Sequence, residues 1–190
     1  AISTLVSSHD MSAEDPAQVM EEIMTGEATP AQFGAFVTAL RLKGETAKEI
    51  AGMARVMREK ALHVRSEGDL VDTCGTGGDG AHTINVSTIA AFVVAGAGLK
   101  VAKHGNRAMS GATGSADVLE ALGAKIDLGP EGVKRCLEQV GFGFMFAQRY
   151  HPAMRFAAGP RREIGIRTVF NILGPLTNPA NASRQVIGVA

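Results

Sequence analysis

The run LVDTCGTGGDG, residues 70–80, decides how the fold of the chain is interpreted. It opens with the apolar pair Leu70-Val71, typical of a short strand, and continues into a loop where four of the six residues 75–80 are glycine. Glycine permits positive φ and close approach of a ligand, and successive N–H groups in such loops can cradle phosphate. The run is neither a Walker A loop nor a GxGxxG that opens directly into a helix. A phosphate-binding loop and an ordinary tight turn both remain open.

Downstream of this run, segments with strand character alternate with segments of helical length. The expected strands are 70–71, 99–102, 142–146 and 185–190, the expected helices are 88–97, 115–122 and 130–140, and a short extended segment surrounds Ile126. Alternation of this kind predicts βαβ units and a mainly parallel sheet. The pattern from Gln148 to Leu173 is again helical.

Upstream of the run, the pattern is helical throughout. Start signals precede three expected helices: Asp15 as N-cap with Pro16 and Gln18, Thr29-Pro30 with Gln32, and Thr46 with Glu49. Gly26 and Gly44 stand where the first two helices should end. Apolar stripes at helical spacing predict a three- or four-helix bundle over residues 15–65. Residues 1–14 have no clear periodicity, and we expect them to fray.

Composition narrows the class of function. The 190 residues carry 19 Lys+Arg and 19 Asp+Glu, and this zero net charge argues against bulk electrostatic binding to nucleic acid or membrane. Trp is absent and Tyr occurs once, so a base-stacking platform is poorly supplied. Cys74 and Cys136 form no disulfide framework and no CxxC pair, which favours two small buried thiols in a reducing compartment. The start AISTLVSSHD lacks the pattern of a secretory signal, and the apolar stretch 89–99 is too short to span a bilayer. We therefore expect a cytoplasmic protein without a membrane partner.

Polar residues precede the first expected helix after the glycine loop. Asn85-Val86-Ser87-Thr88 can cap that helix, whose free N–H groups and positive dipole end favour anions. One interpretation is a plain N-cap, and the other is a seat for a diphosphate with Ser87 Oγ available to a hard cation such as Mg²⁺. Asp79 could hold a metal-bound water or ligand hydroxyls, or cap a turn.

A second polar loop, KHGNRAMSG, residues 103–111, follows the expected strand 99–102. In a parallel sheet it emerges at the same carboxyl edge as the first loop, where ligands bind. Lys103 and Arg107 supply positive charge for phosphate. Asn106, Ser110 and Ser115 supply neutral polar contacts, and an isolated His104 is more often a packed histidine than a catalytic one. Two loops suited to anions at one edge favour a shared site over two solvated surfaces.

Six short motifs occur along the chain in the same order as in a known family. GTGGDG, NVST, KHGNR, GSADVLEALG, YHPAM and NILGPLTNP occur in the order seen in the anthranilate phosphoribosyltransferase family of tryptophan biosynthesis, which the chain resembles over residues 15–190. The resemblance implies a helical domain beside an α/β domain related to nucleoside phosphorylases. It assigns residues 1–66, joined in space by about 150–176, to the helical domain, and 67–149 with 177–190 to an α/β phosphoribosyl-binding domain that is incomplete at its C-terminal end.

The resemblance also implies Mg²⁺, a homodimer formed through the helical domain, and the substrates phosphoribosyl pyrophosphate (PRPP) and anthranilate. It carries the following PRPP contacts: Gly75, Gly78, Asp79, Thr83, Asn85, Val86, Ser87, Thr88, Lys103, Gly105, Asn106, Arg107, Ala108, Met109, Ser110, Gly111 and Ser115, with Ser87 on the metal. The implied anthranilate contacts are Gly75, Asn106, His104, Arg161 and Pro175, with Arg155 and Arg162 as competitors of Arg161. No general base is assigned.

Two departures and three alternatives accompany the resemblance. The family usually carries Ser where Gly111 stands, and family chains continue beyond residue 190 into a part that holds an adjacent Asp-Glu pair for the metals. One alternative is therefore an inactive or partial chain of the enzyme. A second alternative is a pyrimidine-nucleoside-phosphorylase-like enzyme, but the glycine loop of those enzymes has a different sequence. A third is a nucleic-acid-binding paralogue, and the zero net charge argues against it.

Overall fold

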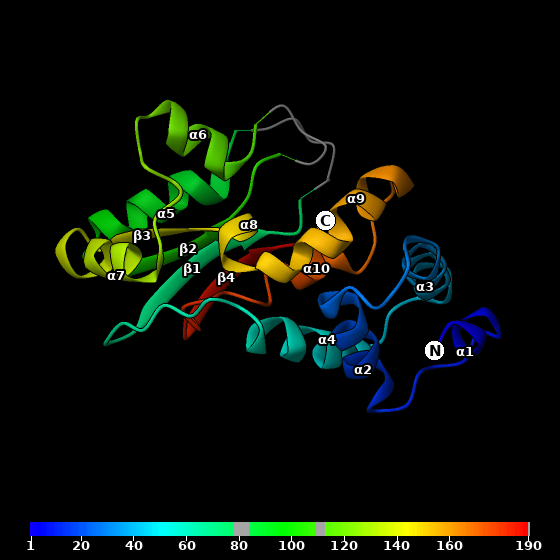
Figure 1. The fold of residues 1–190 in the computed structure, drawn as a ribbon. Coiled ribbons are helices and arrows are strands. Elements are labelled where there is room, and N and C mark those ends of the chain that lie inside the picture. The colour runs from blue at the N-terminus through cyan, green and yellow to red at the C-terminus, as the bar shows by residue number, and fades with distance from the viewer. Residues whose placement is uncertain (78–83, 109–112, 190) are drawn as a thin grey trace. The chain divides into compact units, whose positions relative to one another are not determined.

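The computed structural model describes residues 1–77, 84–108 and 113–189 (Figure 1). It consists of two compact units, each built from separate stretches of chain. The helical unit comprises Ala1–Ala61 and His151–Thr177, and the α/β unit comprises Leu62–Tyr150 and Asn178–Ala190. The two units are described in turn.

The helical unit contains the α-helices α1 (Ile2–Val6), α2 (Asp15–Thr25), α3 (Pro30–Lys43), α4 (Ala47–Glu59), α9 (Arg155–Ile164) and α10 (Phe170–Leu173), with a 3-10 turn at Pro152–Met154. One hydrophobic core unites them, built mainly from the predicted stripes of α2, α3 and α4 and closed by Ala157, Val169, Phe170 and Leu173. Segments of the chain more than a hundred residues apart therefore share this core, and the predicted helical bundle is confirmed.

Capping signals locate two helix starts correctly. Thr29 and Gln32 at α3, and Thr46 and Glu49 at α4, each form a reciprocal capping box. Gly26 ends α2 in the left-handed region at φ +81°.

The prediction of Asp15 as an N-cap was wrong by one position. Asp15 is the first helical residue, and the side chain of Glu14, which precedes it, makes no capping hydrogen bond. Its backbone N–H instead donates to Ser12 Oγ, and its carboxylate accepts from the Ser12 N–H. The expectation that residues 1–14 fray was also wrong, because Leu5 of α1 and Met11 are both buried in the core. A helix of five residues is too short to show a period in sequence.

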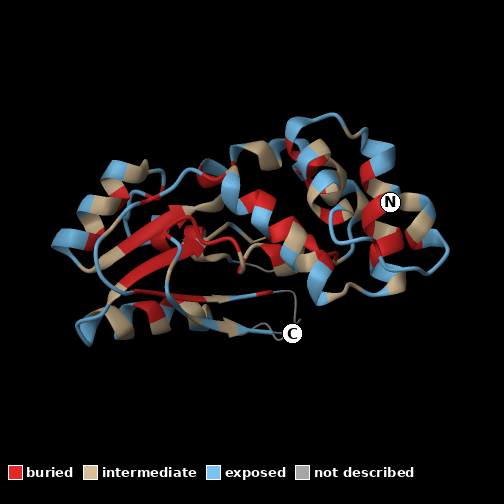
Figure 2. Ribbon diagram, turned by 90° about the horizontal axis from the view of Figure 1, so that it is seen from below, coloured by how far each residue is buried: buried red, intermediate tan, exposed pale blue. Residues whose placement is uncertain are grey.

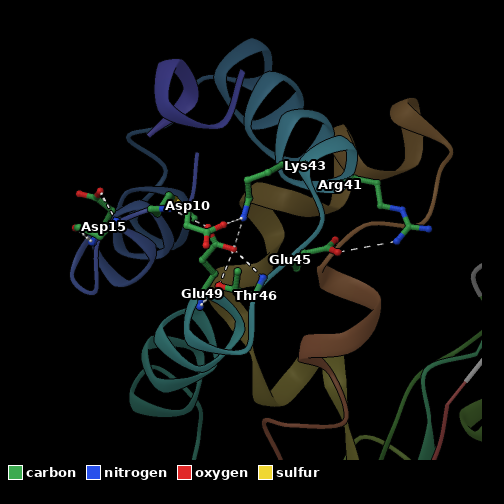
Figure 3. A network of polar contacts seen from close by, with 9 residues as sticks. Asp10, Asp15, Arg41, Lys43, Glu45, Thr46 and Glu49 are labelled. Carbon is green, nitrogen blue, oxygen red and sulfur yellow. Dashed lines mark hydrogen bonds and ion pairs between the residues drawn. The ribbon is translucent and has the colours of Figure 1, made fainter. Parts of the chain in front are cut away.

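A buried carboxylate ties three segments of the helical unit together (Figure 3). The side chain of Glu49, 1% exposed, accepts hydrogen bonds from the Met11 and Thr46 N–H groups and from the Thr46 hydroxyl. Lys43 Nζ lies 2.9 Å from Glu49 Oε2 and 2.6 Å from Asp10 Oδ1. The end of α3, the start of α4 and the segment before α2 are thus held by one charged group.

The α/β unit is built on a four-stranded sheet in the order β3-β2-β1-β4, with all three pairings parallel. Its strands are β1 (Leu70–Gly75), β2 (Lys100–Gly105), β3 (Phe142–Phe146) and β4 (Arg184–Gly188). Its helices are α5 (Val86–Gly96), α6 (Ser115–Ala121), α7 (Pro130–Gln139) and α8 (Ala147–Tyr150). Strands β1, β2 and β3 are largely buried (Figure 2), whereas β4 has no buried residue. The parallel α/β architecture predicted from the alternation is confirmed.

Helices pack on opposite faces of β3 because successive side chains point to opposite sides of a strand. Phe144 packs with Leu119 of α6. Met145, on the other face, packs with Val133 and Leu137 of α7. Ile126 contributes to the Phe144 cluster from a turn, so the extended segment expected there was wrong; its apolar side chain is buried without pairing to a strand. None of the described helices is long and apolar enough to cross a membrane.

Candidate functional site at the carboxyl edge of the sheet

The polar loops leave the sheet at one edge. β1 and β2 are parallel, so Gly75 and Gly105, their last residues, both lie at the carboxyl edge. A Cβ on Gly105 would lie 2.2 Å from Ser115 Oγ and 2.9 Å from Phe144 Cε2, so a larger residue there would displace both side chains. The two sequence motifs predicted to share a site thus begin side by side.

Lys103 links β2 to β1 and to the start of α5. Its side chain is buried, with the residue 1% exposed, and Nζ donates to Thr73 O at 2.5 Å and to Ser87 Oγ at 3.2 Å. Thr73 Oγ1 in turn donates to Ser87 O at 2.7 Å. Burial lowers the pKa of Lys103, although nearby Asp72 and Cys74 favour its charged form. The lysine therefore fixes Ser87 relative to the end of β1.

Asp72 forms a second buried polar centre beneath the site. Its carboxylate accepts from Asn178 Nδ2 at 2.9 Å, from Gln185 Nε2 at 3.0 Å and from the His104 N–H at 3.3 Å. Asn178 Nδ2 also donates to Ala102 O at 2.9 Å. Burial raises the pKa of Asp72, while Asn178 and Lys103 oppose this. Asn178 of the TNP motif thereby connects β1, β2 and the segment before β4.

Cys74 is held as a thiol. Burial and the charge of Asp72 raise its pKa to about 12, and Gln185 Nε2 lies 3.4 Å from its Sγ. A thiol with that pKa is a poor nucleophile at neutral pH. This agrees with the interpretation of Cys74 as a structural residue, although Cys74 and Cys136 are both partly buried, so the expectation of two buried thiols was wrong in degree.

The two loops are joined by a side chain at the start of α5. Asn85 occupies the N-cap position of α5, but its side chain does not cap the helix. Its Nδ2 instead donates to Thr113 O, 3.1 Å away, just before α6. At the same helix start, Val86 is exposed and Thr88 is buried at 1% exposure, with no partner for Oγ1 among the residues that the structure describes. The α5 start and the chain that enters α6 are therefore adjacent.

The charge of Arg107 is already paired. Its guanidinium contacts Asp117 Oδ1 and Glu120 Oε2, both at 2.8 Å, so it is not a free phosphate ligand in this structure. Asn106 Oδ1 accepts from the Arg107 N–H at 2.8 Å, and Asn106 O accepts from Ser115 Oγ at 3.3 Å. Ser115 thus supports the loop through Asn106.

Two candidate anthranilate contacts, Arg161 and Pro175, belong to the helical unit. The Arg161 guanidinium carbon lies 5.3 Å from the centroid of the Phe170 ring, and burial lowers the pKa of Arg161. Arg162 is exposed, and Arg155 is exposed over Phe156 at 4.7 Å. None of the three arginines pairs with a carboxylate among the described residues, and Arg161 differs from the other two in being partly buried.

Comparison with known proteins identifies the family. The family model "Glycosyl transferase family, a/b domain" matches residues 67–190, and "Glycosyl transferase family, helical bundle domain" matches residues 1–61. The chain belongs to the glycosyl transferase family.

The chain is similar to proteins named anthranilate phosphoribosyltransferase. It is 70% identical to the one from Chloroflexus aurantiacus over all of its own 190 residues, which span 56% of that relative. The structure from Thermus thermophilus is 49% identical with a TM-score of 0.93, covering 99% of this chain and 57% of that one. The Saccharomyces cerevisiae structure in complex with PRPP and Mg is 30% identical with a TM-score of 0.90, again over 99% and 57%. These matches confirm the resemblance seen in the motifs. The chain spans about half the length of the relatives that it matches.

Several predicted site residues lie outside the described residues: Gly78, Asp79, Thr83, Met109, Ser110 and Gly111. Within the described part of the chain, no group of three or more His, Cys, Asp and Glu is placed to hold a metal ion. Ser87 Oγ fits Mg²⁺ only as a single oxygen ligand, and Mg²⁺ takes about six, commonly including substrate phosphates. The neighbouring Lys103 ammonium adds positive charge 3.2 Å from that oxygen.

The residues that sequence reasoning missed are Asp72, Asn178, Gln185 and Asp117. The first three meet across separations of 106 and 113 positions, which no local pattern reports. Asp117 lies inside the quoted motif GSADVLEALG, where Asp three residues after Gly114 was a signal for an N-terminal acceptor.

Proposed function

We propose that the protein transfers the phosphoribosyl group of PRPP to the amine of anthranilate, giving phosphoribosylanthranilate and diphosphate in tryptophan biosynthesis. One observation carries the proposal: the Asn85–Thr113 hydrogen bond joins two loops at the carboxyl edge of a parallel sheet. That edge is where such sheets bind ligands. The two substrates are inferred from the similar proteins, which are named anthranilate phosphoribosyltransferase and include one structure in complex with PRPP and Mg.

In this proposal the α/β unit holds PRPP. Its contacts are Gly75, Gly78, Asp79 and Thr83 of the first loop, residues 85–88 at the start of α5, Lys103, residues 105–106 and 108–111, and Ser115. The Arg107 side chain is left out, because it is paired with Asp117 and Glu120. The free N–H groups and the positive dipole end of α5 favour the diphosphate. Lys103 contributes by its charge and by its hold on Ser87. Ser87 Oγ would supply one ligand to Mg²⁺, which supplies positive charge against the leaving diphosphate when bound.

Anthranilate is then recognised by its carboxylate and its ring. Arg161 would bind the carboxylate, and Gly75, His104, Asn106 and Pro175 are the further anthranilate contacts that the resemblance implies. The Arg161 guanidinium is partly buried beside Phe170 and has no carboxylate partner among the described residues. It is therefore available to bind an anion.

The bond changes need no strong general base. The amine lone pair forms the N–C1 bond as the bond from C1 to the diphosphate oxygen breaks, and the diphosphate leaves with that electron pair. The amine then loses a proton to solvent. An aromatic amine is unprotonated at neutral pH, so positioning by Asn106 and Arg161 provides much of the rate.

Direct assays separate this function from its alternatives. The complete polypeptide that carries these residues should consume anthranilate only with both PRPP and Mg²⁺, followed by loss of anthranilate fluorescence. Phosphorolysis of a pyrimidine nucleoside without anthranilate turnover would replace the proposal with a nucleoside phosphorylase. Salt-dependent DNA retention without turnover would favour the nucleic-acid-binding paralogue.

We also propose a cytoplasmic homodimer joined through the helical unit. Val6 of α1 and Leu42 of α3 are 71% and 83% exposed, and a second copy would cover such side chains. Light scattering during size exclusion should give a dimer mass, and Leu42→Glu should give a monomer. A monomer in the unsubstituted protein would contradict this assembly.

A further inference from the structure

One carboxylate, that of Asp117, contacts both a residue that follows β2 and a residue that precedes α6. Asp117 Oδ2 accepts from the Gly114 N–H at 2.8 Å and from the Ala108 N–H at 3.1 Å. Residues 108 and 114 are thus fixed to the same oxygen atom, one on the side of β2 and the other at the start of α6. The other oxygen, Oδ1, accepts from Arg107 Nη1 at 2.8 Å.

The backbone around this carboxylate is tightly packed. A Cβ on Gly114 would lie 2.4 Å from Ala108 N, 2.5 Å from Arg107 C and 2.6 Å from Asn106 O. Those distances are too short for any side chain, so residue 114 must be glycine for the two ends of the loop to approach. The closure at Asp117 and the glycine at 114 therefore support the same backbone arrangement.

Arg107 takes part in the same cluster. Glu120 contacts it through both carboxylate oxygens, with Arg107 Nη1 and Nη2 at 2.8 and 3.1 Å. The Arg107 charge is thus balanced by two carboxylates on α6. Hydrogen bonds from the Gly114 N–H and Arg107, followed by that from the Ala108 N–H, lower the pKa of Asp117, which keeps it ionised at neutral pH.

We propose that Asp117 is a positioning residue for PRPP binding: its carboxylate holds Ala108, which follows β2, and Gly114, which precedes α6, and so presents Asn106 to the substrate. The inference rests on the proposed function. Asp117 acts through the Ala108 and Gly114 N–H groups and does not touch the substrate. Arg107 serves mainly as a partner of Asp117 and Glu120 in this arrangement.

Three substitutions distinguish the hydrogen bonds that Asp117 accepts from the backbone from its ion pair with Arg107. Asp117→Asn keeps a carbonyl oxygen for the two N–H groups and loses the pair with Arg107. Asp117→Ala loses both, and Glu120→Gln weakens the Arg107 cluster without touching the backbone. We expect Asp117→Ala to raise the KM for PRPP about tenfold or more, with the KM for anthranilate changed less than about threefold. Asp117→Asn and Glu120→Gln should stay within about threefold of the unsubstituted protein for both substrates.

A glycine pair provides an independent route to the same loop. Gly114→Ala should reproduce the PRPP defect of Asp117→Ala because the added Cβ separates the loop ends. Gly96→Ala in α5 is the matched control, since its Cβ meets nothing within 4 Å. A normal PRPP KM in Gly114→Ala, or equal defects in Asp117→Asn and Asp117→Ala, would overturn the positioning role.

Amide hydrogen exchange gives a readout that needs no substrate. In the 190-residue chain, Asp117→Ala should speed exchange at Ala108 and Gly114 by about tenfold or more, and Asp117→Asn should largely restore protection. Unchanged protection in Asp117→Ala overturns the inference whatever the activity. Failure of the unsubstituted complete polypeptide to bind PRPP in calorimetry overturns the proposed function instead, and the two failures are therefore distinguishable.

Discussion

The ammonium group of Lys103 lies 3.2 Å from Ser87 Oγ and 2.5 Å from Thr73 O, so one buried side chain fixes the start of α5 against the ends of two strands. This contact explains why a lysine in the KHGNR motif is buried when its charge suggested a surface phosphate ligand. It acts on the proposed diphosphate seat from inside the α/β unit.

Lys103→Met should disturb that seat while roughly keeping the apolar volume of the side chain. Thr73 O and Ser87 Oγ lose their donor, and the positive charge beneath the proposed diphosphate disappears. We expect the KM for PRPP to rise about tenfold or more in the complete polypeptide. Lys103→Arg should not restore it, because a planar guanidinium does not replace a compact ammonium in a site where the residue is 1% exposed. An unchanged KM in Lys103→Met, with folding verified by circular dichroism, would show that the contact is dispensable.

Arg161→Ala tests recognition of the second substrate. Loss of a charge-assisted hydrogen bond to the carboxylate should raise the KM for anthranilate about tenfold or more and leave the KM for PRPP nearly unchanged. Arg162→Ala is the matched control, because Arg162 is exposed on the same helix, α9. Steady-state kinetics with each substrate varied in turn measure both constants. If Arg162→Ala shows the larger defect, the roles assigned to the two arginines are reversed.

Cys74 should resist alkylation in the folded protein. With a pKa of about 12, its thiolate fraction at pH 8 is on the order of a thousandfold below that of an ordinary cysteine with a pKa of about 8.5. Labelling with iodoacetamide in a Cys136→Ser background, followed by mass spectrometry, reports on Cys74 alone, since the chain has 2 cysteines. Rapid labelling under native conditions, at a rate matching that in urea, would contradict the buried thiol.

Glu49 should make the stability of the helical unit depend on acid. Burial alone would raise its pKa, but hydrogen bonds from Thr46, Met11 and Lys43 outweigh burial and lower it below 4.5. A carboxylate with a lowered folded-state pKa contributes stability that is present above its unfolded pKa and lost as pH falls through its folded pKa.

Glu49→Gln should therefore lower the free energy of unfolding by about 1–3 kcal/mol at pH 7 and flatten its decline below about pH 4.5. Urea unfolding followed by circular dichroism from pH 7 to pH 3 measures both effects. Glu59→Gln is the control, because the Glu59 side chain is 60% exposed and its pair with Arg55 spans 3.9 Å. Parallel pH profiles for the unsubstituted protein and Glu49→Gln would refute the role of this carboxylate.

Local signals in the sequence were sufficient for most of the fold. The capping boxes at Thr29 and Thr46 depend on residues three positions apart, and both formed as predicted. The parallel sheet followed from the alternation of strand and helix patterns. The signals failed where a segment was short or where a side chain was buried without strand pairing, as at α1 and Ile126.

The interior of the site was less accessible to prediction. The sequence predicted that two polar loops leave the sheet at one edge, as they do, but it did not show that Asp72 would meet Asn178, 106 positions away. It also assigned Arg107 to phosphate, whereas the structure pairs Arg107 with Asp117 and Glu120. Such pairings depend on tertiary packing, since several partners are equally compatible with a charged residue in a loop.

Calorimetric titration of PRPP into this chain with Mg²⁺ present tests the central claim most directly, namely that the carboxyl edge of the sheet holds a phosphoribosyl diphosphate. We expect PRPP to bind at one site per chain, with affinity at least about tenfold weaker without Mg²⁺ or in Ser87→Ala. Ser183→Ala should bind PRPP with unchanged affinity, because Ser183 lies just before β4, at the opposite edge of the sheet. Ribose 5-phosphate, which lacks the diphosphate, should bind much more weakly. Absence of PRPP binding, or binding indifferent to both Mg²⁺ and Ser87, would contradict the account.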